Sequence, residues 1–186
     1  MSRIWKALKP ALLCFAVMTI LCGVIYTAVV TGIAQLIFPA QANGSIITVT
    51  LKDGTQKDYG SQLILQEFTK PEYLIGRPAG VTNLSPVSKE QEKLVQERID
   101  WWRSLDPGNT NDIPGDLVTA SGSGVDPNIS PAAAEFQVSR IAKTRGMSEN
   151  EIRDIIKQYT KGRFLGFWGE PAVNVLKVNL ALDKLI

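Results

Sequence analysis

Several of the residue types that most often carry out catalysis or bind metals are scarce in this chain. Its 186 residues contain no histidine, and the two cysteines, Cys14 and Cys22, both lie in an uncharged apolar run. Eight helical residues rise about 12 Å, which is too far for a disulfide between them. The sequence after Cys22 therefore supplies neither a thiolate nucleophile nor a His/Cys zinc site. An enzyme built on this chain would depend on Asp, Glu, Lys, Ser or Tyr.

Serine chemistry is the first possibility to weigh. Some membrane-anchored peptidases use a Ser–Lys pair, but no motif singles out a Ser and a Lys here, and each serine is better explained as a cap or turn residue. The run Ser121-Gly122-Ser123-Gly124 suits anion binding, because glycines let backbone N–H groups surround a phosphate. It lacks the spacing and the terminal Gly-Lys-Ser/Thr of a P-loop. The Asp126-Pro127 and Ser130-Pro131 pairs that follow favour a rigid structural turn.

The segment that determines where the chain lies in the cell is an apolar stretch near the N-terminus. Residues 10–38 contain no charge, and about 20 apolar residues suffice to cross the hydrocarbon core of a bilayer. A cleaved signal peptide has a shorter apolar region, although Ala40-Gln41-Ala42 resembles a cleavage site. A lipoprotein signal needs a small residue before its cysteine, whereas Leu13 and Leu21 stand there. The sequence predicts one transmembrane helix over residues 10–38.

The charges around this segment predict its direction. Arg3, Lys6 and Lys9 precede it, and no further basic residue occurs until Lys52. By the positive-inside rule, residues 1–9 are cytoplasmic and residues 39–186 form one extracytoplasmic domain. After Lys9 the chain has 17 basic and 18 acidic residues, a net charge near −1, which gives no indication of a nucleic-acid surface. Gly23, Thr27 and Thr31 recur every four residues, which fits either a helix partner or tolerance of lipid.

The domain after the helix shows both strand and helix patterns. Residues 46–51 and 55–59 predict a small hairpin around Asp53-Gly54, after a polar exit over residues 39–45. Residues 62–68 fit a strand or a short helix, and residues 71–86 are rich in turn residues. Ser88 and Gln91 fit a capping box that opens a helix ending before Asp106-Pro107-Gly108, with Val95, Ile99 and Trp102 on one face.

Two further helices and a C-terminal strand complete the predicted domain. Ser130 caps a helix with Pro131 at its first position, a buried stripe, and an end at Gly146; the stripe is Ala134, Val138, Ile141 and Ala142. Ser148 and Glu151 form a capping box for the next helix, which ends near Gly162 and turns to the core Ile152, Ile155, Ile156 and Tyr159. Residues 173–182 suggest a strand that turns helical at its end. The fold class is α+β: a transmembrane helix followed by one small mixed domain.

These residues resemble the KdpC family, one component of the bacterial Kdp potassium-transporting ATPase, over essentially the whole chain. Each matching segment is modest alone, but their order and spacing behind one span make the joint match specific. The segments are Gln41-Ala42-Asn43-Gly44-Ser45, Gly76-Arg77-Pro78, Asn83-Leu84-Ser85-Pro86, residues 116–131, residues 137–146, Glu170-Pro171, Val173-Asn174-Val175-Leu176 and Asn179-Leu180-Ala181-Leu182-Asp183. The family tends to have a basic residue where Ala172 stands and a proline where Ser139 stands.

The resemblance implies a non-catalytic accessory subunit in the cell inner membrane. Its partners would be a channel-like potassium-binding subunit, a P-type ATPase subunit and a small single-span subunit, and the complex would use ATP and potassium. Asp183-Lys184 is followed by Leu185, so this chain lacks the Asp-Lys-Thr-Gly phosphorylation site of the ATPase subunit. The family is proposed to aid nucleotide binding or to cover the external potassium entrance. For the nucleotide role the resemblance points to Ser121, Gly122, Ser123, Gly124 and Gln137.

Two other classes of protein stay open at the level of sequence. An anchored extracytoplasmic hydrolase would use serine and lysine, and a solute-binding module would act alone. The charge asymmetry puts residues 121–137 on the side of the membrane opposite to ATP, so the external role is preferred to the nucleotide role. No metal ligand is predicted in this chain, and potassium coordination by it is not expected, because one span cannot enclose an ion pore.

Overall fold

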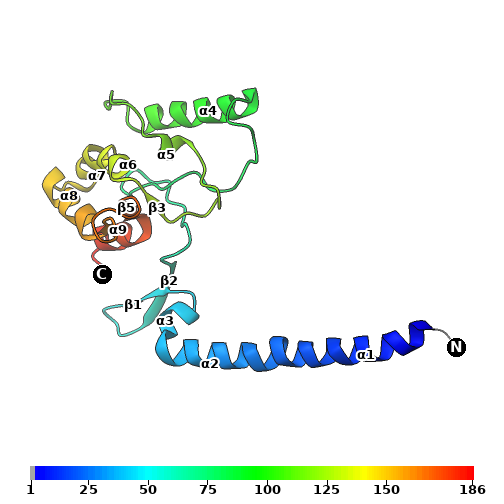
Figure 1. Ribbon diagram of the computed structural model, residues 1–186. Helices are drawn as coiled ribbons and strands as arrows, with labels where there is room; N and C mark the ends of the chain where they lie inside the picture. Colours follow the sequence, from blue (N-terminus) through cyan, green and yellow to red (C-terminus); the bar gives the residue numbers. More distant parts are fainter. Residues whose placement is uncertain (1–2) are drawn as a thin grey trace. The chain divides into compact units, whose positions relative to one another are not determined.

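A computed structural model describes residues 3–186 of the chain (Figure 1). The chain divides at residue 46 into two compact units, an N-terminal one and a larger one over residues 47–186. The first unit is helical, and the second mixes short strands with helices. The architecture is therefore a long apolar helix followed by a small α+β domain, as the sequence predicts.

The N-terminal helix runs without interruption over Ile4–Ile37. It comprises α1 (Arg3–Met18), a π-helical stretch (Thr19–Tyr26) and α2 (Thr27–Ile37). Its most apolar window has a mean hydropathy of 2.4 and is 0% buried, so length and composition suffice to cross a membrane. Helix formation begins before Pro10, which lies inside α1, because Arg and Lys are good helix formers.

The exit from this helix contains one more helical turn, α3 (Pro39–Ala42), where the sequence predicts only a break. Pro39 opens it, as expected for a residue with no N–H to leave unpaired. The amides of Gln35 and Asn43 bond to each other, at 3.0 and 3.2 Å. Gly44 and Ser45 then adopt positive φ angles of 82° and 52°, which turn the chain into the first strand.

The predicted hairpin is confirmed. Strand β1 (Ile46–Thr50) pairs with β2 (Gln56–Ser61) in a two-stranded sheet. In the turn, the Asp53 carboxylate accepts the Thr55 N–H at 2.9 Å and the Thr55 hydroxyl at 2.6 Å. These bonds lower the pKa of Asp53, since they stabilise its ionised form.

The remaining elements form the core of the domain. A three-stranded antiparallel sheet has the order β3-β5-β4, with Val173 of the central strand opposite Ile129 and Thr160. The bounds of the strands are β3 (Asn128–Ile129), β4 (Thr160–Lys161) and β5 (Ala172–Asn174). The helices are α4 (Lys89–Leu105), α5 (Gly115–Val118), α6 (Pro131–Glu135), α7 (Val138–Arg145), α8 (Glu149–Gln158) and α9 (Val175–Leu182).

The predicted helix starts are confirmed by their hydrogen bonds. Ser88 accepts the Gln91 N–H at 3.2 Å, and Ser130 accepts the Ala133 N–H at 3.1 Å. The predicted capping box at Ser88 forms only by half, because the Ser88 N–H donates to the Ser85 carbonyl at 3.0 Å and not to the Gln91 side chain. Ser148 and Glu151 form a reciprocal capping box at α8. The predicted core faces reach the core: Ile141 and Ile152 are both 0% exposed, and Val95, Ile99, Ile155 and Tyr159 are half-buried against it. Gly146 ends α7 in the left-handed conformation, with φ 64°.

Two predictions for this domain need correction. Residues 131–145 are not one helix, because the chain breaks between α6 and α7 at Gln137. The Gln137 side-chain amide donates to the Ala133 carbonyl at 3.1 Å, while the Gln137 backbone N–H turns to Ala134. The predicted strand over residues 173–182 does turn helical, but much earlier than at its end. It ends at Asn174, whose side chain accepts the Lys177 N–H at 3.1 Å and starts the buried helix α9.

Residues 62–80 contain no regular helix or strand. The alternatives of a strand or a short helix over residues 62–68 are therefore both wrong. Part of this segment is nevertheless deep in the core, since Leu74 is 0% exposed and Ile75 is 8% exposed. An irregular segment in a core needs partners for its backbone N–H and C=O groups, and the site described next supplies them.

Candidate functional site

The candidate site is a buried pair of side-chain amides that hold the backbone of Leu74 and Ile75. The Asn179 side chain accepts the Leu74 N–H at 2.8 Å and donates to the Leu74 carbonyl at 2.8 Å. The Gln137 side chain accepts the Ile75 N–H at 2.8 Å and donates to the Ile75 carbonyl at 2.9 Å. Each amide thus bonds both backbone groups of one residue, as the backbone of a neighbouring strand would. We call Gln137 and Asn179 the amide clamp.

Helix positions explain why these two side chains meet one segment. Gln137 immediately precedes α7, and Asn179 lies on the buried face of α9. Both are almost fully buried, at 0% and 1% exposure. A buried amide that lacks partners costs about 1–3 kcal/mol for each unsatisfied group, so the clamp and the segment each stabilise the other.

Arg140 closes the Gln137 end of the clamp. Its guanidinium donates to the Gln137 amide oxygen at 2.7 Å, to the Tyr73 carbonyl at 3.1 Å and to the Pro71 carbonyl. It also lies over the Trp102 ring, 5.9 Å from the centroid. Burial lowers the pKa of Arg140 to about 10. The guanidinium is held largely by uncharged oxygens, so its role is to fix the chain.

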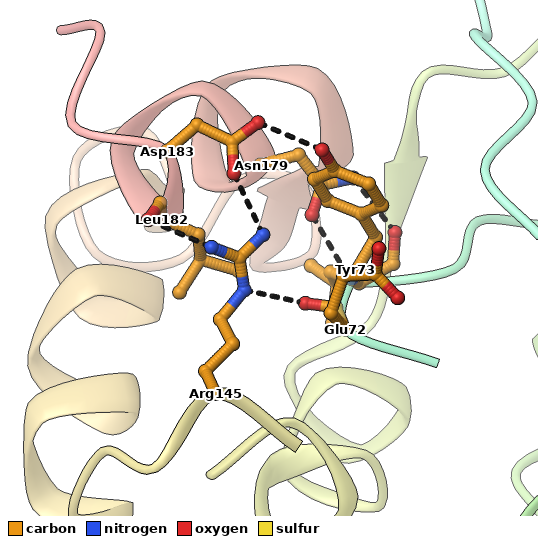
Figure 2. A network of polar contacts seen from close by, with 7 residues as sticks. Glu72, Tyr73, Arg145, Asn179, Leu182 and Asp183 are labelled. Atoms are coloured by element: carbon orange, nitrogen blue, oxygen red, sulfur yellow. Dashed lines mark hydrogen bonds and ion pairs between the residues drawn. The ribbon is translucent and has the colours of Figure 1, made fainter. Parts of the chain in front are cut away.

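A second arginine joins the start of the same segment to α9. Arg145 donates to the Glu72 carbonyl at 2.6 Å, to the Leu182 carbonyl at 2.9 Å and to the Asp183 carboxylate at 2.8 Å (Figure 2). The Tyr73 hydroxyl donates to the other Asp183 oxygen at 2.8 Å, and this bond raises the pKa of Tyr73. Figure 2 shows the carboxylate of Asp183 between these two donors.

Beyond the clamp, the same segment is hydrogen-bonded to the serine–glycine run and the residues just before it. Arg77 donates to the Ala120 carbonyl at 3.1 Å and to the Thr119 carbonyl at 3.3 Å. The Gly80 N–H donates to the Gly124 carbonyl at 2.9 Å. A Cβ at Gly124 would lie 2.7 Å from the Gly80 carbonyl carbon, and the φ of Gly124 is +71°, so only glycine fits there.

The serine–glycine run uses much of its own hydrogen-bonding capacity. The Gly124 N–H donates to the Ser121 carbonyl at 3.1 Å. The Ser123 hydroxyl accepts the Val125 N–H at 3.3 Å, and the Ser121 hydroxyl accepts the Asp126 N–H at 3.4 Å. Three donors that a phosphate would need are therefore already bonded inside the turn. This geometry agrees with the structural turn that the sequence favours.

One hollow borders the clamped segment, and another borders the serine–glycine run. One, of about 310 Å³, lies between residues 65–79 and α4 and includes Arg77 and Trp101. The other, of about 360 Å³, is lined by Ser121, Gly122 and Arg98 among others. Arg98 also donates to the Val118 carbonyl at 2.8 Å. Among residues 3–186, no group of three or more His, Cys, Asp or Glu side chains could hold a metal ion.

The five residues named for nucleotide contact thus lie in different surroundings. Gly122 and Ser123 are exposed, Ser121 is half-buried and Gly124 is buried, all in one turn. Gln137 is fully buried, and its amide makes four hydrogen bonds. A ligand could reach that amide only after some of these bonds open. The role of Gln137 and Asn179 in the clamp was missed from the sequence, because their partners are 62 and 105 residues away.

The chain matches known proteins over nearly its full length. The sequence profile of the family described as "KdpC: K+-transporting ATPase, c chain" matches residues 8–184. The potassium-transporting ATPase KdpC subunit of Listeria monocytogenes is 56% identical over 188 residues, which cover 100% of this chain and 99% of the relative. The KdpC subunit of Clostridium perfringens is 48% identical, with 97% of this chain and 98% of the relative covered.

The KdpC subunit of Methylococcus capsulatus is also 48% identical, over 95% of this chain and 97% of the relative. Three of the segments that carry the resemblance, residues 116–131, 137–146 and 179–183, supply hydrogen bonds to residues 71–80 or to the clamp that holds them. The long apolar helix, the mixed domain behind it and the full-length matches agree, and the chain belongs to the KdpC family of K+-transporting ATPase c chains.

Proposed function

We propose that this chain is the non-catalytic accessory subunit of an ATP-driven potassium import complex. The full-length match to potassium-transporting ATPase KdpC subunits is the observation that carries the proposal. Its partners are a channel-like potassium-binding subunit, a P-type ATPase subunit and a small single-span subunit. The chain stabilises their assembly.

The long helix supplies the membrane contact in this proposal. The apolar window of Ile4–Ile37 is 0% buried within the chain, so its side chains are free to meet lipid or other helices. Residues 10–38 span the inner membrane, and Gly23 permits close approach of a partner helix, because glycine has no side chain to separate the two backbones. The basic residues before Pro10 keep residues 1–9 in the cytoplasm.

The domain over residues 39–186 lies outside the cytoplasm and acts through its surface. The buried polar groups support a role for the surface, because the clamp and Arg140 form their hydrogen bonds with the chain's own backbone and so are already occupied. A domain built in this way offers a rigid body for contact with the transport subunits and for covering the external potassium entrance.

Affinity purification tests the assembly role. The full chain carries a C-terminal tag and is extracted in mild detergent from cells that produce the whole complex. We expect a multispanning protein and an ATPase that becomes phosphorylated by ATP to co-purify with it. Recovery of the tagged chain alone, with its domain folded, would contradict the proposal.

Protease accessibility on intact cells tests the orientation. In this proposal residues 121–137 are exposed to a protease added outside the inner membrane. Cleavage in that region only after the membrane is ruptured would place the domain in the cytoplasm. The control is a cytoplasmic protein that stays intact in the unruptured sample.

The nucleotide role of Ser121, Gly122, Ser123, Gly124 and Gln137 stays a prediction of the resemblance. It requires the domain to share a compartment with ATP. A photoreactive ATP analogue, applied to the purified complex, tests it by mass spectrometry of the labelled peptides. Label on residues 121–137 that excess ATP removes would support that role, and label confined to the ATPase subunit would count against it.

A further inference from the structure

The connection between β4 and β5 carries large apolar side chains into solvent. Phe164, Leu165, Phe167 and Trp168 are 65%, 71%, 70% and 68% exposed. They follow one another within a tight loop over residues 163–170. A contiguous exposed apolar patch marks an interaction site more often than scattered single residues do. We call residues 163–170 the aromatic knob.

The knob is built before any partner arrives. The Phe164 N–H donates to the Trp168 carbonyl at 2.8 Å, and the Trp168 N–H donates back to the Phe164 carbonyl at 2.9 Å. Leu165 and Gly166 turn the chain at φ 53° and 83°. The Arg163–Glu170 ion pair at 2.8 Å closes the base. Such preorganisation reduces the entropy lost on binding.

A groove lies beside the base of the knob. It has a volume of about 540 Å³ and is lined by Leu63, Tyr159, Lys161 and Ala172 among others. Lys161 is the last residue of β4 and Ala172 is the first of β5, so the groove and the knob share the same two strands. A projecting apolar loop next to a hollow suits contact with a shaped protein surface.

The size of the knob limits the kind of partner. Aromatic side chains bury about 150–250 Å² each, so four residues exposed by about two thirds offer about 500 Å². A stable interface between free proteins needs about 800 Å² from each partner. The knob alone is too small to hold a second copy of the chain or a freely diffusing protein. It is sufficient for a partner that another contact already holds nearby, because the second contact is then intramolecular in effect.

The charges near the knob favour a protein recess over a lipid surface. Glu170 is paired with Arg163 at the base, so the knob presents little net charge. Lys161 and Lys177 line the neighbouring groove, and these two are fewer than the roughly four to eight clustered basic residues that draw a segment to anionic headgroups. The surface that fits the knob is therefore apolar, uncharged and concave.

We propose that the aromatic knob docks into an apolar recess on the extramembrane face of a multispanning subunit of the same transport complex. The inference rests on the proposed function, since the membrane helix is the contact that holds this partner nearby. The knob is then the second attachment point of the chain. It sets the position of the domain on the transport subunits.

Site-specific photo-crosslinking tests the docking directly. A benzoylphenylalanine replaces Phe167 in the full chain, in membranes that contain the whole complex, and a matched control replaces Val87, which is 93% exposed. We expect an adduct with a multispanning subunit at Phe167, at least about tenfold stronger than at Val87. Adducts only with lipid, only with a second copy of the chain, or none at all would overturn the proposal.

A pair of substitutions gives the second test. The Phe164→Ser and Phe167→Ser changes are made together, and Val87→Ser is the matched control. We expect the amount of partner retained on the tagged chain after a long detergent wash to fall at least about tenfold for the double variant, and not for the control. Circular dichroism of the purified full chain checks that its domain is folded.

The outcomes separate this inference from the function on which it rests. If the unchanged chain recovers no ATPase, the proposed function fails. If the unchanged chain and the folded double variant retain the partner equally, only the docking of the knob is overturned.

Discussion

The amide clamp and the aromatic knob invert the usual distribution of side chains in opposite ways. In the clamp, the polar groups Gln137 and Asn179 are buried, at 0% and 1% exposure. In the knob, Phe167 and Trp168 are 70% and 68% exposed. Both regions belong to the same domain, and both depart from the rule that apolar residues lie inside and polar residues outside.

The difference lies in where each region finds its partners. The clamp has all of them within the chain, since each amide bonds both backbone groups of one core residue. The knob satisfies its backbone within its own loop but leaves its side chains in water. Burial of a polar group costs free energy only when its partners are missing, and exposure of an apolar group costs free energy until a partner covers it. The clamp therefore supports the fold, and the knob is available for assembly.

Removal of a clamp amide has the largest expected effect. Gln137→Leu leaves the Ile75 N–H and carbonyl without their partner and deprives Arg140 of an acceptor. We expect the free energy of unfolding of the domain to fall by about 3 kcal/mol or more. Urea unfolding of the full chain in detergent, followed by circular dichroism, measures it. Gln158→Leu, at an exposed amide at the end of α8, is the control. A loss below about 1 kcal/mol would show that the clamp is dispensable.

The serine–glycine turn tests whether a mostly exposed loop is fixed by the clamped segment. Gly124→Ala puts a Cβ 2.7 Å from the Gly80 backbone at a positive φ, and we expect a loss of about 2 kcal/mol. Gly122→Ala is the matched control, because nothing lies within 4 Å of a Cβ there. The same unfolding measurement compares them. Equal stability of the two variants would show that the close contact between Gly124 and Gly80 does not fix the turn.

The capping box of α8 is an exposed polar contact, so its effect should be smaller and depend on pH. The Ser148 N–H and hydroxyl both donate to Glu151 at 2.8 Å and lower its pKa below the ordinary 4.5. The carboxylate therefore stabilises the fold fully above pH 4.5, and this contribution is lost as the pH falls through the lowered pKa. The melting temperature of the Glu151→Gln variant should therefore fall less steeply than that of the unchanged chain as the pH is lowered below 4.5. Ser148→Ala should act in the same direction. If the melting temperature of both variants fell with pH as steeply as that of the unchanged chain, the capping box would not be the source of this pH dependence.

The knob should have the smallest effect on the fold itself. Phe167→Ser removes an exposed side chain, and we expect the free energy of unfolding to change by no more than about 0.5 kcal/mol. Phe136→Ser, at a residue that is 8% exposed and packed on Trp102, is the contrasting variant and should destabilise by about 3 kcal/mol. If Phe167→Ser destabilised as much as Phe136→Ser, the knob would be part of the core.

Much of the fold is readable from the sequence because its signals are local. Ser130 bonds a backbone N–H three residues away, and Ser148 bonds Glu151, so each cap is complete within a single turn. The hairpin around Asp53-Gly54 is closed by contacts between residues two to four positions apart. The segments that carry the resemblance include both Gln137 and Asn179. The resemblance could not say that Gln137 and Asn179 bind backbone, because nothing near them in the sequence identifies Ile75 or Leu74 as partners.

The sequence by itself determined the long apolar helix, the helix caps, the hairpin and the family, since each depends on composition or on neighbours within a few residues. Only the tertiary structure decided that residues 131–145 break at Gln137, and that the C-terminal helix begins as early as Val175 and is buried on most sides. It also decided that residues 71–80 cross the core without regular structure. The physical reason is that the backbone hydrogen bonds of Leu74 and Ile75 are completed by side chains 105 and 62 residues away, which become neighbours only in the folded domain.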